Sequence, residues 1–240
     1  MTPEIVILCA TAASIAFVHT LAGPDHYLPF VALARSRQWS LGRAVGTTLW
    51  CGVGHILGSV LLGLIGLYAS IQLGALQWIE SVRGDLAAWL LVSCGLVYTA
   101  WGLRRAHRNR PHTHWHTHGS LRHQHPHNHR GEHTHVHTPA EPADRRRSVI
   151  AWAIFIIFIV GPCEPLIPLL MFPAASESLL GLVAVTTVFA LVTLATMTAA
   201  VVLSLRGLRS VRLPGVDRFS DAIAGCTMIL CGLSLTLWGL

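Results

Sequence analysis

Long apolar stretches alternate with short polar segments along this chain. Six stretches carry almost no charge, and they cover residues 5–34, 44–69, 86–103, 149–172, 179–205 and 221–240. A helix needs roughly 20 mostly apolar residues to cross a bilayer, so the pattern predicts an all-α membrane protein with six transmembrane helices. Composition agrees, because only 12% of the residues are charged, whereas in soluble domains the share is about a quarter.

Two halves and a central loop follow from this pattern. We expect one three-helix half over residues 1–103, a His-rich loop over 104–148 and a second three-helix half over 149–240. The first span of each half contains a similar motif, Gly-Pro-Asp-His at 23–26 and Gly-Pro-Cys-Glu at 161–164. Two halves of three spans each have opposite orientations in the membrane, so the pattern predicts inverted repeats, whose paired Gly/Pro-interrupted segments flank a central binding site.

All 17 basic residues are arginine, and their distribution predicts the topology. Sixteen of the 17 lie in the loops after the first, third and fifth spans, and the other two loops contain only Arg83. By the positive-inside rule the arginine-rich loops are cytoplasmic. We therefore expect a multi-pass protein of the cytoplasmic (inner) membrane with both termini outside, whose basic loops contact anionic lipid rather than nucleic acid.

The first span contains polar residues that suit a metal ion. Pro24 lacks an amide hydrogen and disturbs the helix, and a charge such as that of Asp25 is costly near the centre of a bilayer. On an unbroken helix His19 and His26 would stand about 10 Å apart along the axis, so only a break lets both converge with Asp25. Two imidazoles and a carboxylate suit nickel, cobalt or zinc. The alternative is a hydrogen-bonded polar cluster without metal.

Further candidate ligands lie in the second and fourth spans. His55 follows Gly54 inside the second span, and Cys163 and Glu164 follow Gly161-Pro162 in the fourth. An ionisable residue inside a membrane segment indicates function by default, so Glu164 is interpreted as a ligand or a proton carrier. The alternatives are a hydrogen bond across a helix interface for His55 and an ion pair with arginine for Glu164.

The central loop holds 12 of the 15 histidines, many in His-x-His alternation. It contains almost no aliphatic residues, so it cannot bury enough apolar surface to order itself and is predicted to be disordered. Histidine-rich tracts are typical of metal binding. We expect this loop to collect or buffer metal in the cytosol, with a cytosolic metallochaperone as a candidate partner. A solvated linker that binds metal only incidentally is the alternative.

These motifs resemble the nickel/cobalt transporter superfamily, which includes nickel/cobalt efflux proteins and urease-accessory-type membrane proteins. His19, Asp25 and His26 are similar to its first-helix motif of a histidine, four residues and Asp-His, although five residues intervene here. Gly54-His55 is similar to its second element. The resemblance implies a secondary transporter of nickel or cobalt, with the matched residues at the selectivity site.

The function expected from sequence is therefore transport rather than catalysis. The sequence contains no Walker A motif, which favours coupling to an ion gradient over direct use of ATP. It also contains no His-Glu-x-x-His motif, so nothing in it indicates a zinc hydrolase. The cargo is expected to be nickel or cobalt, with zinc as a third candidate, and export is favoured over uptake. Two alternatives stay open: a non-transporting metal sensor or metallochaperone anchor, and a thiol-disulfide carrier, which would need a cysteine pair.

Overall fold

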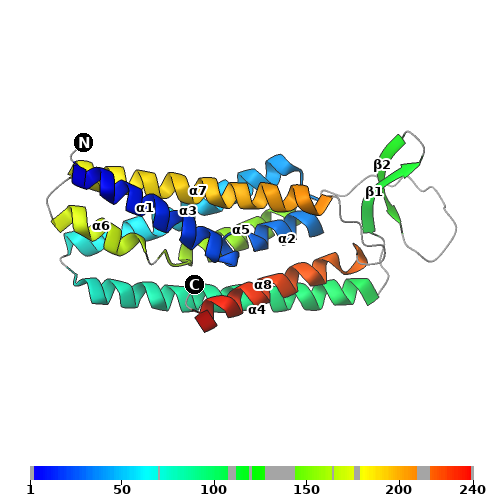
Figure 1. The fold of residues 1–240 in the computed structure, drawn as a ribbon. Helices are drawn as coiled ribbons and strands as arrows, with labels where there is room; N and C mark the ends of the chain where they lie inside the picture. Colours follow the sequence, from blue (N-terminus) through cyan, green and yellow to red (C-terminus); the bar gives the residue numbers. More distant parts are fainter. Residues whose placement is uncertain are drawn as a thin grey trace.

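A computed structural model describes residues 3–69, 71–107, 112–118, 121–127, 144–163, 165–175, 179–209 and 217–238. Helices dominate it (Figure 1). In chain order the elements are α1 (Pro3–Ala22), the 3₁₀ turn η1 (Pro24–His26), α2 (Leu28–Ser36), α3 (Leu41–Tyr68), α4 (Leu73–His107), β1 (His112–His118), β2 (Leu121–His127), α5 (Asp144–Val160), α6 (Leu166–Ala175), α7 (Leu179–Arg209), η2 (Asp217–Phe219) and α8 (Ser220–Trp238).

Five helices in the described part of the chain are long and apolar enough to cross a membrane: α1, α3, α4, α7 and α8. Many of their large apolar side chains, such as Ile7, Trp78 and Leu180, are exposed on the bundle surface, which suits contact with lipid. The chain is therefore a multi-pass membrane protein. The described residues do not form six uninterrupted spans, because the fourth predicted span is divided into α5 and α6, of 17 and 10 residues.

The third predicted span, 86–103, is wrong in its bounds. Helix α4 begins at Leu73 and ends at His107, and Arg83 lies inside it rather than in a loop. Charged residues at 80, 83 and 85 interrupt the apolar run and made the segment resemble a connection. Glu80 and Arg83 are ion-paired across one helical turn, and the Glu80 side chain is buried, so their charges do not end the helix.

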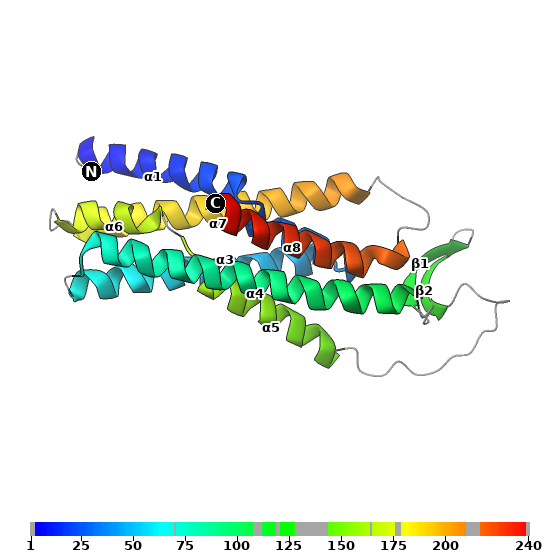
Figure 2. The same ribbon diagram turned by 90° about the horizontal axis from the view of Figure 1, so that it is seen from below.

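The long helices run along a common direction, and the two predicted breaks lie near the middle of the bundle (Figure 2). Helices α1 and α6 occupy the end away from the β1–β2 hairpin, whereas α2 and α5 lie toward the hairpin. The chain ends that lead into the three arginine-rich loops, at α2, α4 and α7, all lie at the hairpin end. The structure thus brings the helix ends that lead into the arginine-rich loops to the same end of the bundle.

Helices α4 and α8 approach each other so closely that glycine is required where they cross. A Cβ atom on Gly95 would lie 2.7 Å from the carbonyl oxygen of Gly225 and 2.9 Å from the amide nitrogen of Ile229. Gly225 would meet the backbone of Thr99 at 2.5 Å. Small residues allow this kind of close packing between membrane helices.

We expect Gly95→Ala to destabilise the protein by about 1–3 kcal/mol, because the added methyl group meets backbone atoms that cannot rotate away. The measurement is thermal unfolding of the purified protein in detergent. Gly46→Ala in α3 is the matched control, since a Cβ there meets nothing within 4 Å. Equal unfolding temperatures for the two variants would contradict the close crossing.

A buried carboxylate fastens three helices at the hairpin end. Asp221, at the start of α8, accepts hydrogen bonds at Oδ1 from Ser36 of α2 at 2.6 Å and from the Tyr98 hydroxyl of α4 at 3.1 Å. Its Oδ2 accepts a bond from Arg105 at 2.7 Å, and the Arg37 Nε donates to the Tyr98 hydroxyl at 2.7 Å. These contacts fix α2 against α4 and α8.

The His-rich segment contains an antiparallel hairpin, which the sequence did not predict. Strands β1 and β2 pair with three histidines directly opposite three others, at 112/127, 114/125 and 116/123. Backbone pairing of this kind needs no apolar side chains. The loop is also shorter than predicted, because α4 continues to His107 and α5 begins at Asp144, and its remaining residues lie outside the described residues.

Candidate metal site

The predicted break in the first span is confirmed at Gly23-Pro24. Helix α1 ends at Ala22, Gly23 adopts extended angles (φ −85°, ψ 95°), and the chain turns through η1 before α2 begins. A Cβ atom on Gly23 would lie 2.5 Å from Nδ1 of His26 and 3.0 Å from Oδ1 of Asp25. Glycine at this position therefore lets the polar side chains fold back against the break.

His26 is buried and its ring is oriented by the break. Nδ1 lies 3.1 Å from the carbonyl oxygen of Gly23 and 3.2 Å from Oδ1 of Asp25. Both neighbours are acceptors, so Nδ1 carries the proton and donates, which leaves the lone pair on Nε2. Metal-binding histidines commonly have this arrangement, in which an outer-shell acceptor fixes the tautomer.

His55 is oriented in the same way from α3. Its Nδ1 lies 3.2 Å from the carbonyl oxygen of Phe158 in α5, so that nitrogen donates and Nε2 is again the atom with a lone pair. The ring is buried, and a Cβ on Gly161 would come within 3.3 Å of its Nδ1. The last turn of α5 thus orients His55, and the glycine that follows the helix leaves room for its ring.

Three imidazole rings converge at this point. The centroid of the His26 ring lies 4.9 Å from that of His19 and 5.3 Å from that of His55. The Nε2 atoms of all three histidines are buried without a hydrogen-bond partner among the described residues. An unsatisfied buried polar group costs about 1–3 kcal/mol, so these atoms are expected to bind a water molecule or a metal ion. Atoms with free lone pairs are what a metal ion requires.

A small cavity of about 20 Å³ adjoins these side chains. Asp25, His26 and His55 supply its polar lining, and Gly161 and Pro162 of the second broken segment line it too. Its apolar lining comes from α4, α5 and α8. The volume suffices for about one water molecule or a cation of that size, so the polar atoms have a space to act upon.

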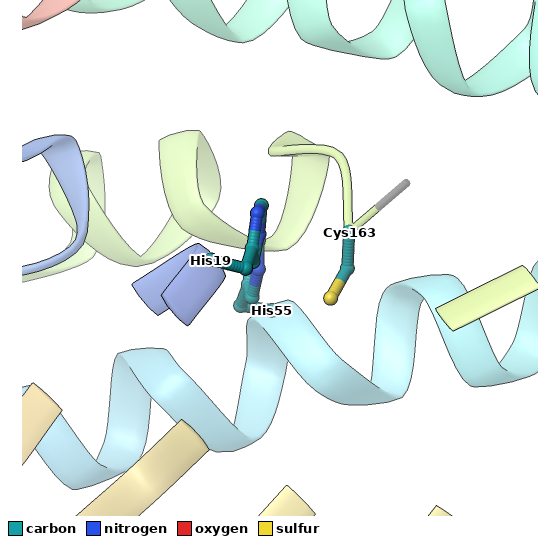
Figure 3. Close-up of side chains that lie close together, drawn as sticks. All are labelled: His19, His55 and Cys163. Carbon is teal, nitrogen blue, oxygen red and sulfur yellow. The ribbon is translucent and has the colours of Figure 1, made fainter. Parts of the chain in front are cut away.

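The second break is confirmed at Gly161-Pro162, and it brings Cys163 to the same place. Helix α5 ends at Val160 and α6 begins at Leu166. Cys163 is fully buried, and its Sγ and one ring nitrogen each of His19 and His55 all lie within 4.8 Å of one another. Figure 3 shows the three side chains approaching from α1, α3 and the α5–α6 segment. Glu164, the other ligand predicted in this motif, lies outside the described residues.

Sequence reasoning missed the Glu80–Arg83 pair of α4, which supports this second break. Arg83 Nη1 donates to Oε1 of Glu80, and its Nη2 donates to the carbonyl oxygens of Ile159 at 3.1 Å and Gly161 at 3.2 Å. The amide of Cys163 donates to Oε2 of Glu80 at 3.2 Å. A glutamate and an arginine three residues apart inside an otherwise apolar segment was the signal that could have identified the pair.

The assembled side chains can hold a transition metal but offer little for redox transfer. Imidazole nitrogens, a carboxylate and a thiol match the ligand types of nickel, cobalt and zinc, whereas magnesium and calcium prefer oxygen ligands. All six cysteines are free. No family model, curated protein or solved structure matches the chain, so its function is argued from this site.

Proposed function

We propose that the protein is a secondary transporter of a divalent transition metal, with nickel, cobalt and zinc as the candidate cargoes. One observation carries the proposal: three imidazoles, from α1, η1 and α3, meet with their Nε2 atoms buried and without a hydrogen-bond partner among the described residues. They lie where one helix is broken and beside a second break. Irregular backbone and ionisable side chains at membrane depth are typical of substrate pathways.

The ligand atoms form two neighbouring stations that share His55. Asp25, His26 and His55 line the small cavity, and His19, His55 and Cys163 form the second group. A cation that moves from one station to the other keeps its bond to His55 while it exchanges the remaining ligands. Partial exchange of this kind avoids the cost of stripping a bare cation inside a low-dielectric interior.

We further propose that the two halves are inverted repeats, with the broken α1–α2 and α5–α6 segments each counting as one of six membrane crossings. Reciprocal packing supports this interpretation. Helix α1 packs on α7 as α5 packs on α3, α2 packs on α8 as α6 packs on α4, and α2 packs on α7 as α6 packs on α3. A pseudo-twofold axis exchanges these pairs, and in such transporters the site lies where the broken segments meet.

The orientation and driving force follow the sequence pattern. We place the protein in the inner membrane with the hairpin end of the bundle, where the arginine-rich loops begin, on the cytoplasmic side. Both termini then lie on the opposite side of the membrane. A cytosolic His-rich loop would raise the local metal concentration at the inner mouth, so export is favoured over uptake. Protons compete with metal for the same nitrogens, so a proton gradient can drive release.

The direct experiment is metal flux in proteoliposomes. We expect the purified protein to move radioactive nickel, and to move cobalt or zinc in competition with it, when metal and proton gradients are imposed. A variant with asparagine in place of the histidines between 112 and 137 should retain flux at high metal and lose it at low metal, because only collection is impaired. The measurement is initial flux against metal concentration for both proteins.

Two controls measure the background flux. One is vesicles without protein, and the other is potassium-loaded vesicles with the protein but without a metal gradient. Absence of flux from the intact protein under every gradient would contradict transport. If metal binding then disappeared with the loop histidines, the protein would instead be a membrane-anchored metal sensor or metallochaperone anchor.

A further inference from the structure

Cys163 packs in a buried apolar cluster with Ala12, Ala16 and Leu166, and its thiol also lies beside two imidazoles. Five of the six cysteines lie within the regular helices α1, α3, α4 and α8: Cys9, Cys51, Cys94, Cys226 and Cys231. Cys163 instead follows Pro162 in the irregular segment between α5 and α6, fully buried, with its Sγ turned toward two imidazoles.

The neighbouring imidazoles and the thiol are close enough to bind one metal ion together. His55 is 3% exposed and its Nε2 has no partner among the described residues, while its Nδ1 is already occupied by the carbonyl of Phe158. The ligand atoms of His19, His55 and Cys163 lie within 4.8 Å of one another. In a tetrahedral site with metal–nitrogen bonds near 2.0–2.1 Å and metal–sulfur bonds near 2.3 Å, ligand atoms stand about 3.3–3.6 Å apart. Side-chain rotation over about an ångström closes that difference.

We propose that Cys163 is a thiolate ligand of the transported ion. With His19 and His55 it forms a binding station of two nitrogen atoms and one sulfur atom. This station selects thiophilic cations that prefer tetrahedral coordination, so it binds zinc and cobalt in preference to nickel and manganese. The proposal rests on the transport function and narrows its cargo. Thiolate ligands select softer ions, and tetrahedral geometry with sulfur is typical of zinc.

Metal binding at this station releases one proton from the thiol. The Sγ–H bond of Cys163 breaks, an Sγ–metal bond forms, and the proton is released to water. Two neutral imidazoles complete the protein ligands, and the fourth position of the tetrahedron stays with an exchangeable water. Zinc sites with three protein ligands and one open position exchange ligands, whereas closed four-ligand sites are structural. A station that must release its cargo needs the open form.

Glu80 and Arg83 act as positioning residues for Cys163. The carboxylate of Glu80 accepts the Cys163 amide at 3.2 Å, and the Arg83 guanidinium holds the carbonyls of Ile159 and Gly161 on the other side of Pro162. Neither side chain belongs to the group of ligand atoms formed by His19, His55 and Cys163. The pair therefore fixes the backbone on both sides of the proline and with it the direction of the thiol.

Cobalt titration of the full-length protein tests the ligand directly. The variant without loop histidines at 112–137 serves as the parent, which removes the nitrogen sites of the hairpin. We expect tetrahedral cobalt bands together with a near-ultraviolet thiolate-to-cobalt charge-transfer band. Cys163→Ser should abolish the charge-transfer band, whereas Cys51→Ser and Cys231→Ser, which alter buried cysteines elsewhere, should retain it.

Selectivity and positioning supply independent readouts. In competitive flux, Cys163→Ser should lower the preference for zinc over manganese by roughly 10-fold or more. Glu80→Gln keeps an acceptor oxygen for the Cys163 amide but loses the charge that holds Arg83, so we expect cobalt affinity to fall about 10-fold, as for outer-shell partners generally. The position of the charge-transfer band should not move.

The outcomes separate this inference from the transport function. A charge-transfer band that persists in Cys163→Ser, or cobalt bands without any thiolate component in a protein that transports cobalt, would overturn the inference and leave transport standing. Unchanged cobalt affinity in Glu80→Gln would remove the positioning role. Loss of both cobalt binding and flux in the parent would overturn the transport proposal itself.

Discussion

Replacing His55 with alanine should abolish metal flux while leaving the helices folded. His55 lines the small cavity and also belongs to the group formed with His19 and Cys163, so its loss removes a ligand from both proposed stations. Loss of an outer-shell partner typically weakens metal affinity 10–100-fold, and loss of a shared ligand should exceed roughly 100-fold. The measurements are flux in proteoliposomes and cobalt titration of the same preparation.

The fold should tolerate this change because the imidazole adds little net stability. Its Nδ1 makes one hydrogen bond, to Phe158, but its Nε2 is buried without a partner in the described structure, and such a group costs about as much as a hydrogen bond contributes. His107→Ala is the matched control, since His107 is exposed at the end of α4. Normal flux in His55→Ala would refute the shared-ligand arrangement.

Sequence alone located both breaks, because proline acts locally. Pro24 and Pro162 each follow a glycine inside an apolar run, and the loss of the amide hydrogen and the crowding of the preceding turn do not depend on tertiary context. The convergence of His19 with His26 depended on the same break: an intact helix would have kept them about 10 Å apart, and the structure brings their ring centroids to 4.9 Å.

Sequence could not reveal how the two halves meet. Cys163 was named only from the repeated motif, and its approach to His19 and His55 depends on packing between α1, α3 and the α5–α6 segment. The bounds of α4 failed for a related reason. In the sequence a charged pair interrupts an apolar span. In the structure the Glu80 carboxylate is buried against the second break and bound to Arg83, a tertiary arrangement that hydrophobic periodicity does not encode.

Breaking the Glu80–Arg83 ion pair should have a large effect on the stability of the protein. We expect Arg83→Met to lower the free energy of unfolding by about 3–5 kcal/mol, because removing one partner of a buried ion pair leaves the other charge uncompensated. The carbonyls of Ile159 and Gly161 lose the guanidinium as well. Thermal unfolding in detergent, followed by circular dichroism, measures the change. Arg206→Met in α7 is the control, since Arg206 is exposed and surface substitutions typically stay within about 0.5 kcal/mol.

The double variant Glu80→Leu/Arg83→Met distinguishes stability from function. Replacing both members of a buried ion pair with apolar residues is often neutral, so most of the lost unfolding free energy should return. Cobalt affinity should stay low, because the Cys163 amide then has no Glu80 oxygen to hold it and the thiol loses its fixed direction. A double variant that is no more stable than Arg83→Met alone would show that the charges are not coupled. Recovery of both stability and cobalt affinity would show that α4 contributes only packing to the second break.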